Sequence, residues 1–587
     1  MKYIKPKNWT DINNQQGLLF FAQTLSEALF HYTLDTYKPQ ALNVRLLCIE
    51  ALNTIDDIKA GLIKKPNIIS IIDELICSLN SDTVSKELLG DQLEEIIATI
   101  NKHRSNLHQL KEVILLLYHY FDNKKYLLKI QEYLSDLVII GREKGKIYKA
   151  TRLYLTELIN YGYSTGAVYH ITHGYFFDPK KNVTTNSPNE FLEILNFSKK
   201  KYKVIFRASK HFNEFKTLED IFKFKISTKL SSKDFEGENK RYIDDIQNDE
   251  VYIIFDQVEA FDDNTARLVT ETPLLKIGNL FSFYHHKEVP YIHEFALVTN
   301  KSDNYSTLRE MPIKSIIKKS DIKPNIAAQK VQNLLKLELP TNTIKRIGKA
   351  IDLHSTSLTS EQIENKLLSL WTAIEMLIPK DEDSGIDRIV QIANAIVPFQ
   401  TYKYLNKIII QAQLDFMYYD RIKYSRILKK IDFEDNGNNI IALASLLMTA
   451  ENEASRKKVL ESLNENPLLK WRLNDLHNNF SSGKNVLKFI EDHKQKVEWQ
   501  IRRIYRVRNL IVHSGKMPSY TNLLVENLHN YFDDFLNYLI DHSITEKRLK
   551  TMDEAILNCK IECNILEKKL KDIGDNTISK SSVKNII

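Results

Sequence analysis

One short stretch of the chain combines residue types that could cleave a phosphodiester bond. Residues 496–516 read KVEWQIRRIYRVRNLIVHSGK, with Arg508 five residues before His513. Histidine exchanges a proton near neutral pH, and arginine pairs with a phosphate and stabilises charge growing on its oxygens. Attack of a 2′-hydroxyl on the adjacent phosphorus needs little more than these groups. Arg508 and His513 are therefore candidate catalytic residues.

Further cations flank this pair. If this stretch is a catalytic site for RNA, four of them are candidate RNA contacts: Arg502, Arg503, Arg506 and Lys516. Arg506 lies seven residues before His513, on nearly the same helix face, so it remains an alternative to Arg508 as the catalytic arginine. Each of these residues also has a purely structural interpretation. Arg508 could form an interhelical salt bridge, the His513 imidazole could cap the helix C-terminus, and residues 502–506 could be a solvated basic face.

The spacing of apolar residues places this stretch on a helix that ends at Gly515. The apolar stripe runs through Val497, Ile501 and Ile504, and its continuation reaches Arg508. On an ideal helix, residues five apart point about 140° away from each other. Convergence of Arg508 and His513 therefore requires the long arginine side chain, a distorted helix end or a second protomer. A symmetric homodimer would gather two of each residue around one phosphate.

Two motifs carry a resemblance to a known family. Residues 508–513, RNLIVH, resemble the R-N-x-x-x-H form of the Arg-x(4–6)-His motif of HEPN domains. Upstream, residues 370–375, LWTAIE, are similar to the Trp-x-x-x-Glu helix of the ApeA-like branch of bacterial HEPN proteins. The two motifs occur in the expected order, and the resemblance covers roughly residues 355–545.

The resemblance implies a metal-independent, cofactor-free endoribonuclease of anti-phage defence. Such a toxin would act in abortive infection by cleaving host RNA, with transfer RNA as a plausible substrate, and would leave a 2′,3′-cyclic phosphate. Its active site would form in a homodimer, with Asn509 and Glu375 supporting the Arg508 and His513 side chains. Residues 1–350 would sense a phage-derived trigger or hold the enzyme inactive.

Two alternatives from other functional classes stay open. The HEPN bundle could be catalytically silent, binding a nucleotide or nucleic acid or serving as a scaffold, with Arg508 locked to Glu375. A weaker alternative is DNA binding through the 502–508 face, although no helix-turn-helix signal accompanies it.

The composition predicts a mainly α-helical protein. Gly 16 and Pro 14 are each below 3% of 587 residues, against usual shares of about 7% and 5%. So few turn formers argue against an all-β sandwich, a repeat barrel or a disordered chain. The net charge of +7, from 82 Lys+Arg and 75 Asp+Glu, permits a polyanionic partner without requiring one.

The periodicity of apolar residues divides the chain into four regions. Short β-branched and aromatic segments at 202–206, 224–228, 251–255 and 295–299 predict strands in the middle of the chain. We expect a helical N-terminal region at 1–165, an α+β middle region with a sensor or regulatory role at 166–350, an all-helical HEPN bundle at 351–545, and a charged helix and tail at 546–587.

The remaining signals exclude several classes of protein. Four cysteines without a CxxC pair favour a reducing cytoplasm. The apolar run 18–22 is too short for a signal peptide, and no stretch approaches 18 uninterrupted apolar residues, so we expect no membrane association. His285, His286 and His293 lack zinc-type spacing, and we expect surface or strand-end histidines there.

Overall fold

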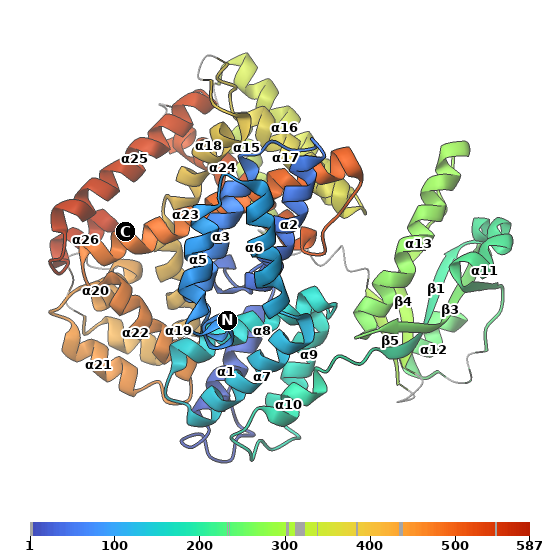
Figure 1. The fold of residues 1–587 in the computed structure, drawn as a ribbon, viewed down its shortest axis with the longest axis horizontal. Helices are drawn as coiled ribbons and strands as arrows, with labels where there is room; N and C mark the ends of the chain where they lie inside the picture. Colours follow the sequence, from blue (N-terminus) through green and yellow to red (C-terminus); the bar gives the residue numbers. More distant parts are fainter. Residues whose placement is uncertain are drawn as a thin grey trace. The chain divides into compact units, whose positions relative to one another are not determined.

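The computed structural model describes residues 4–231, 233, 235–300, 305–310, 323–336, 339–382, 385–431, 433, 438–545 and 549–587. The fold is mainly α, as the composition predicts, with one five-stranded sheet in the described part of the chain (Figure 1). The chain forms two compact units. The first comprises Met1–Thr156, Phe177–Pro188 and Ile322–Ile587, and the second comprises Glu157–Phe176 and Asn189–Asp321.

The N-terminal part of the chain folds into a series of helices, as predicted for residues 1–165. They are α1 (Gln16–Leu29), α2 (Val44–Lys59), α3 (Asn67–Ser81), α4 (Thr83–Leu89), α5 (Gln92–Lys102), α6 (Leu107–Tyr120), α7 (Asn123–Ile140) and α8 (Lys144–Tyr161). Side-chain caps begin several of them: Asn43 accepts from the Leu46 amide, and Asn106 from the amides of His108 and Gln109.

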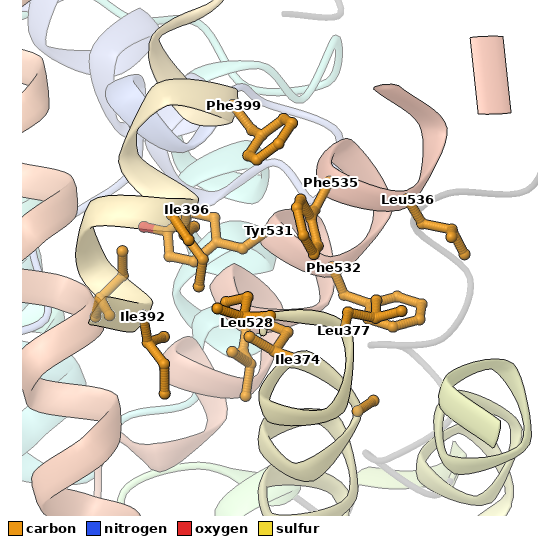
Figure 2. Packing of buried hydrophobic residues seen from close by; sticks show 14 of the residues in the cluster. Ile374, Leu377, Ile392, Ile396, Phe399, Leu528, Tyr531, Phe532, Phe535 and Leu536 are labelled. Carbon is orange, nitrogen blue, oxygen red and sulfur yellow. The ribbon is translucent and has the colours of Figure 1, made fainter. Parts of the chain in front are cut away.

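A helical bundle forms the first core of the C-terminal part. Its helices are α16 (Thr341–Thr359), α17 (Ile363–Leu377), α18 (Arg388–Thr401), the C-terminal half of α23 (Gly483–Ser514) and α24 (Thr521–Thr545), with α15 (Pro324–Leu335) preceding them. The four-residue and three-residue spacing of apolar side chains on α17 buries Leu370, Trp371 and Ile374 completely. Figure 2 shows Ile374 and Leu377 packing towards side chains of α18 and α24.

A second core lies at the other end of α23. It is formed by α19 (Tyr404–Leu428), α20 (Asn439–Met448), α21 (Glu453–Glu461), α22 (Pro467–Phe480) and α26 (Lys580–Ile586). Both α23, at 32 residues, and α25 (Met552–Ile573) contribute side chains to the two cores. The region predicted as a charged helix and tail ends in α26, whose Val583 and Ile586 are buried in the second core.

The second unit contains an antiparallel sheet with strand order β2-β3-β1-β4-β5. The strands are β1 (Lys200–Ser209), β2 (Phe224–Ser227), β3 (Glu250–Ala260), β4 (Ile292–Asn300) and β5 (Tyr305–Glu310). The four predicted strand segments are confirmed, and β5 is an addition. On β1, Val204 and Phe206 face one core while Ile205 faces the other, the alternation of a sheet covered on both sides.

Helices cover both faces of this sheet. The unit's helical elements are α9 (Thr165–Phe176), α10 (Asn189–Ile194), η2 (Lys210–Leu218), α11 (Glu219–Phe222), α12 (Gly237–Asp244) and α13 (Asp263–Tyr284). Side chains of α13 join the core that contains Val204, and Tyr242 of α12 joins the core that contains Ile205. The edges of the unit, at Glu157 and Asp321, differ from the predicted 165/166 and 350/351 boundaries. One reason is that α16 packs on α17 within the helical bundle.

None of the described helices combines the length and the apolar character needed to cross a lipid bilayer.

Candidate functional site

The candidate catalytic residues lie at the C-terminal end of α23. This helix begins at the Ser482 cap, whose hydroxyl accepts from the Asn485 amide, and it ends at Gly515 with a φ of 64°. A left-handed residue at this position favours glycine, and the Gly515 amide donates to the Ile511 carbonyl. Because α23 is helical through Ser514, Arg508 and His513 keep helical spacing and point about 140° apart. The helix end is not distorted in a way that brings them together.

Arg508 is half-buried and has no carboxylate partner among the described residues. Its Nη1 donates to the side-chain Oδ1 of Asn509 at 3.1 Å. Arg508 therefore lies at the border of the packed core, at the end of the apolar stripe of α23. Such a guanidinium keeps donors for an anionic group.

Arg503 and Arg506 lie in a different environment, because both are buried against carboxylates of the N-terminal helices. Arg503 pairs with Glu50 of α2 at 3.1 Å and with Glu74 of α3 at 2.5 Å. Arg506 pairs with Glu50 at 2.8 Å and donates to the Ser70 hydroxyl at 3.1 Å. Burial acts to raise the pKa of Glu50, but the two guanidinium groups outweigh it and lower that pKa to about 2.

The predicted basic surface is therefore not continuous. The side chains of Arg503 and Arg506 are 3% and 4% exposed, so neither faces solvent as an RNA contact would require. The reason is that the apolar stripe of α23 continues into an interface with α2 and α3, where Glu50 and Glu74 compensate the buried charge. Arg502 is more accessible but pairs with Glu498 one turn earlier, at 2.8 Å. Lys516 is exposed.

Glu375 lies apart from the candidate catalytic residues Arg508 and His513 in the contacts of the described residues. Among the described residues its carboxylate makes no hydrogen bond or ion pair with Arg508 or His513, and it lies in the field of Arg388. Arg388 donates to the carbonyl oxygens of Glu375 and Ile378, at 2.9 and 2.8 Å, and so caps the C-terminus of α17. Burial lowers the pKa of Arg388, and the charge of Glu375 acts in the opposite direction. In the described part of the chain, no hydrogen bond or ion pair supports the predicted role of Glu375 in orienting Arg508 or His513.

His513 is exposed on the last turn of α23. Two neighbouring apolar side chains are also open to solvent: Val512 is 50% exposed and Met517 46% exposed. His513 is thus accessible and is flanked by apolar surface.

A second cluster of titratable groups lies where α16 packs against α24, and its residues were not predicted from the sequence. The Nε2 atoms of His354 and His529 lie 2.8 Å apart, and Asp533 places a carboxylate oxygen 3.4 Å from Nδ1 of His529. Burial raises the pKa of Asp533 to about 6, against the lowering effect of His354. The four-residue spacing of His529 and Asp533 on one helix was a usable signal, whereas His354 lies 175 residues earlier.

No family model, no curated protein and no solved structure matches this chain. The HEPN resemblance accordingly stays a prediction from residues 370–375 and 508–513.

Proposed function

We propose that the chain is a metal-independent endoribonuclease whose active site is built from Arg508 and His513 of two protomers. One observation carries this proposal: of the four arginines at 502–508, Arg508 is the one without a carboxylate partner in the described part of the chain. A phosphate-binding arginine must be able to exchange water for phosphate, and a buried, ion-paired arginine is not available for that exchange. Arg508, rather than Arg506, is therefore the proposed catalytic arginine.

The roles of the two residues follow from their chemistry. The Arg508 guanidinium binds the scissile phosphate and stabilises the charge that grows on its oxygens, while Asn509 restrains the guanidinium. A His513 imidazole removes the proton from the 2′-hydroxyl as that oxygen attacks phosphorus, and the other protomer's imidazole gives a proton to the departing 5′-oxygen. The bond from phosphorus to the 5′-oxygen breaks, and a 2′,3′-cyclic phosphate remains.

A second copy of the chain is part of the proposal because one helix alone separates the pair. With α23 helical to Ser514, Arg508 and His513 diverge, and a symmetric partner supplies the missing residue of each type. The exposed Val512 and Met517 give such a contact some apolar surface next to His513. The active site would form only in the homodimer.

The N-terminal helices are suited to control this site. Glu50 and Glu74 hold Arg503 and Arg506 of the helix that carries the catalytic pair. A trigger that displaced α2 or α3 would leave two buried guanidinium groups without charge compensation, and α23 would have to readjust. We propose on this basis that a phage-derived trigger acts through the N-terminal region, and that cleavage of host RNA, transfer RNA among its targets, causes abortive infection.

Cleavage by purified full-length protein tests the proposal. Wild type should cut a transfer RNA pool in the presence of EDTA, leaving 2′,3′-cyclic phosphate ends. Arg508→Ala and His513→Ala should each slow cleavage by roughly 10²-fold or more, because each removes a group that acts on the reacting phosphate.

Two matched controls make the result specific. Arg421→Ala and His119→Ala remove an exposed arginine and an exposed histidine far along the chain from α23, and both variants should cleave at the wild-type rate. Unchanged cleavage by the His513→Ala variant would exclude the mechanism. Intact RNA together with retained nucleotide binding would instead support the catalytically silent binding module.

A further inference from the structure

The cluster of His354, His529 and Asp533 has the composition of a transition-metal site. Their ligand atoms all lie within 4.8 Å of one another. Two imidazole nitrogens and one carboxylate oxygen form a donor set that suits Zn²⁺ and similar divalent ions. Among the described residues, this is the one group of three or more His, Cys, Asp or Glu side chains placed closely enough to hold an ion.

Secondary structure fixes the three donors. His529 and Asp533 are four residues apart on α24 and so share one face of that helix. His354 comes from α16, and its ring stacks on Phe532 with centroids 5.0 Å apart and planes within 10°. Phe532 belongs to the bundle core shown in Figure 2. The packing of the bundle therefore orients the His354 imidazole before any ligand arrives.

The orientation of the nitrogens matches coordination. The two Nε2 atoms face each other at 2.8 Å, and Nδ1 of His529 lies 3.4 Å from Oδ2 of Asp533. The other carboxylate oxygen, Oδ1, is 3.9 Å from Nε2 of His354.

The distances require only a small adjustment. Donors around tetrahedral Zn²⁺, each at about 2.0–2.1 Å from the metal, are about 3.3 Å apart. The two Nε2 atoms must move apart by roughly 0.5 Å, and Oδ1 must move inward by about as much, which side-chain rotations supply. The side chains of His354, His529 and Asp533 are 19%, 18% and 35% exposed, so an ion can enter from solvent.

We infer that His354, His529 and Asp533 bind one divalent transition-metal ion of the zinc type, which links α16 to α24. Three protein donors leave at least one coordination position for water or another oxygen ligand. This site is independent of the proposed ribonuclease chemistry, which uses Arg508 and His513 without a metal.

Metal titration of EDTA-treated, full-length protein tests the inference. Wild type should bind one Zn²⁺ per chain and melt at a higher temperature with Zn²⁺, but not with Mg²⁺, which prefers an all-oxygen shell. Co²⁺ should give the visible absorption of a low-symmetry site without thiolate charge-transfer bands, which separates it from binding at Cys559 and Cys563. His354→Asn and His529→Asn should each weaken Zn²⁺ binding at least tenfold.

A control variant and two outcomes complete the test. His119→Asn removes an exposed histidine of α6 and should bind Zn²⁺ like wild type. If His529→Asn fails to fold, His354→Asn and Asp533→Asn carry the same test. Equal Zn²⁺ affinity and stoichiometry in wild type and the folded variants would overturn the inference. Loss of RNA cleavage on EDTA treatment, with Zn²⁺ binding intact in the titration, would contradict the metal-independent mechanism and leave this site standing.

Discussion

At the scale of single residues, burial separates cations that look alike in the sequence. Arg503, Arg506 and Arg508 occupy six residues of one helix, yet two are paired with buried carboxylates and one keeps donors at the border of the core. The apolar spacing predicts Arg508 on the core-facing stripe, whereas the buried arginines are Arg503 and Arg506. It could not tell which arginines are paired, because Glu50 lies more than 450 residues before Arg503 and helical periodicity carries no information about such contacts.

His493 provides a prediction at this scale. Burial lowers its pKa to about 3, and its Nε2 donates to the Gln400 carbonyl at 3.2 Å while its ring stacks on Tyr404. Between pH 6.5 and 3 the unfolded chain binds a proton at this histidine that the folded chain excludes. As the pH is lowered through this range, the free energy of unfolding therefore falls by about 1.4 kcal/mol per pH unit.

The corresponding experiment compares wild type with His493→Gln. Urea unfolding from pH 7 to pH 5 should show the wild type losing about 2 kcal/mol more than the variant, since glutamine does not titrate. Parallel pH profiles for the two proteins would mean that His493 does not stay neutral in the folded state.

At the scale of elements, the periodicity of apolar residues correctly predicted helices and strands. Contacts between elements far apart in the sequence could not be predicted from it. Apolar residues recur at helical spacing along α17, as expected for the all-helical region 351–545, and its side chains fill the bundle core. The four strand segments were recognisable from their β-branched and aromatic residues, whereas β5 was not identified. This strand depends on pairing with β4, which local sequence does not encode.

The approach of α25 to the start of α23 leads to a prediction for helix packing. A Cβ added at Gly483 would lie 2.5 Å from the Leu570 carbonyl oxygen and 2.8 Å from Cβ of Ile573. Gly483→Ala should therefore lower the free energy of unfolding by about 1–3 kcal/mol, because backbone atoms must move. Gly348→Ala is the matched control: no atom lies within 4 Å of its added Cβ on α16, and it should stabilise by up to about 1 kcal/mol. Equal thermal stability of the two variants would refute this close approach.

At the scale of the whole molecule, buried ion pairs join the N-terminal helices to the C-terminal ones within the first compact unit. Arg472 of α22 pairs with Glu27 of α1 and, at 3.1 Å, with Asp415 of α19. Arg503 and Arg506 pair with Glu50 in the same way. Residues 1–156 of the expected N-terminal region share one compact unit with the region 351–545, which the sequence could not reveal because each has its own apolar periodicity.

Removing one member of these pairs should cost far more than removing a surface charge. Glu50→Gln removes the carboxylate that pairs with both Arg503 and Arg506, and it should lower the free energy of unfolding by roughly 3–5 kcal/mol. Asp387→Asn breaks the exposed pair with Lys64, 3.0 Å apart, and should leave the unfolding midpoint nearly unchanged, because solvent screens that pair. Denaturant melts of both variants measure the difference, and a small effect of Glu50→Gln would show that the network does not hold the two regions together.

The central claim is that His513 of α23 takes part in RNA cleavage. The most direct measurement is sequencing of new 5′ ends in total RNA after expression of wild type and of His513→Ala in the same cells. The account predicts discrete new ends, and arrested growth, with wild type, and neither with the variant. The same new ends in cells that express His513→Ala would contradict it.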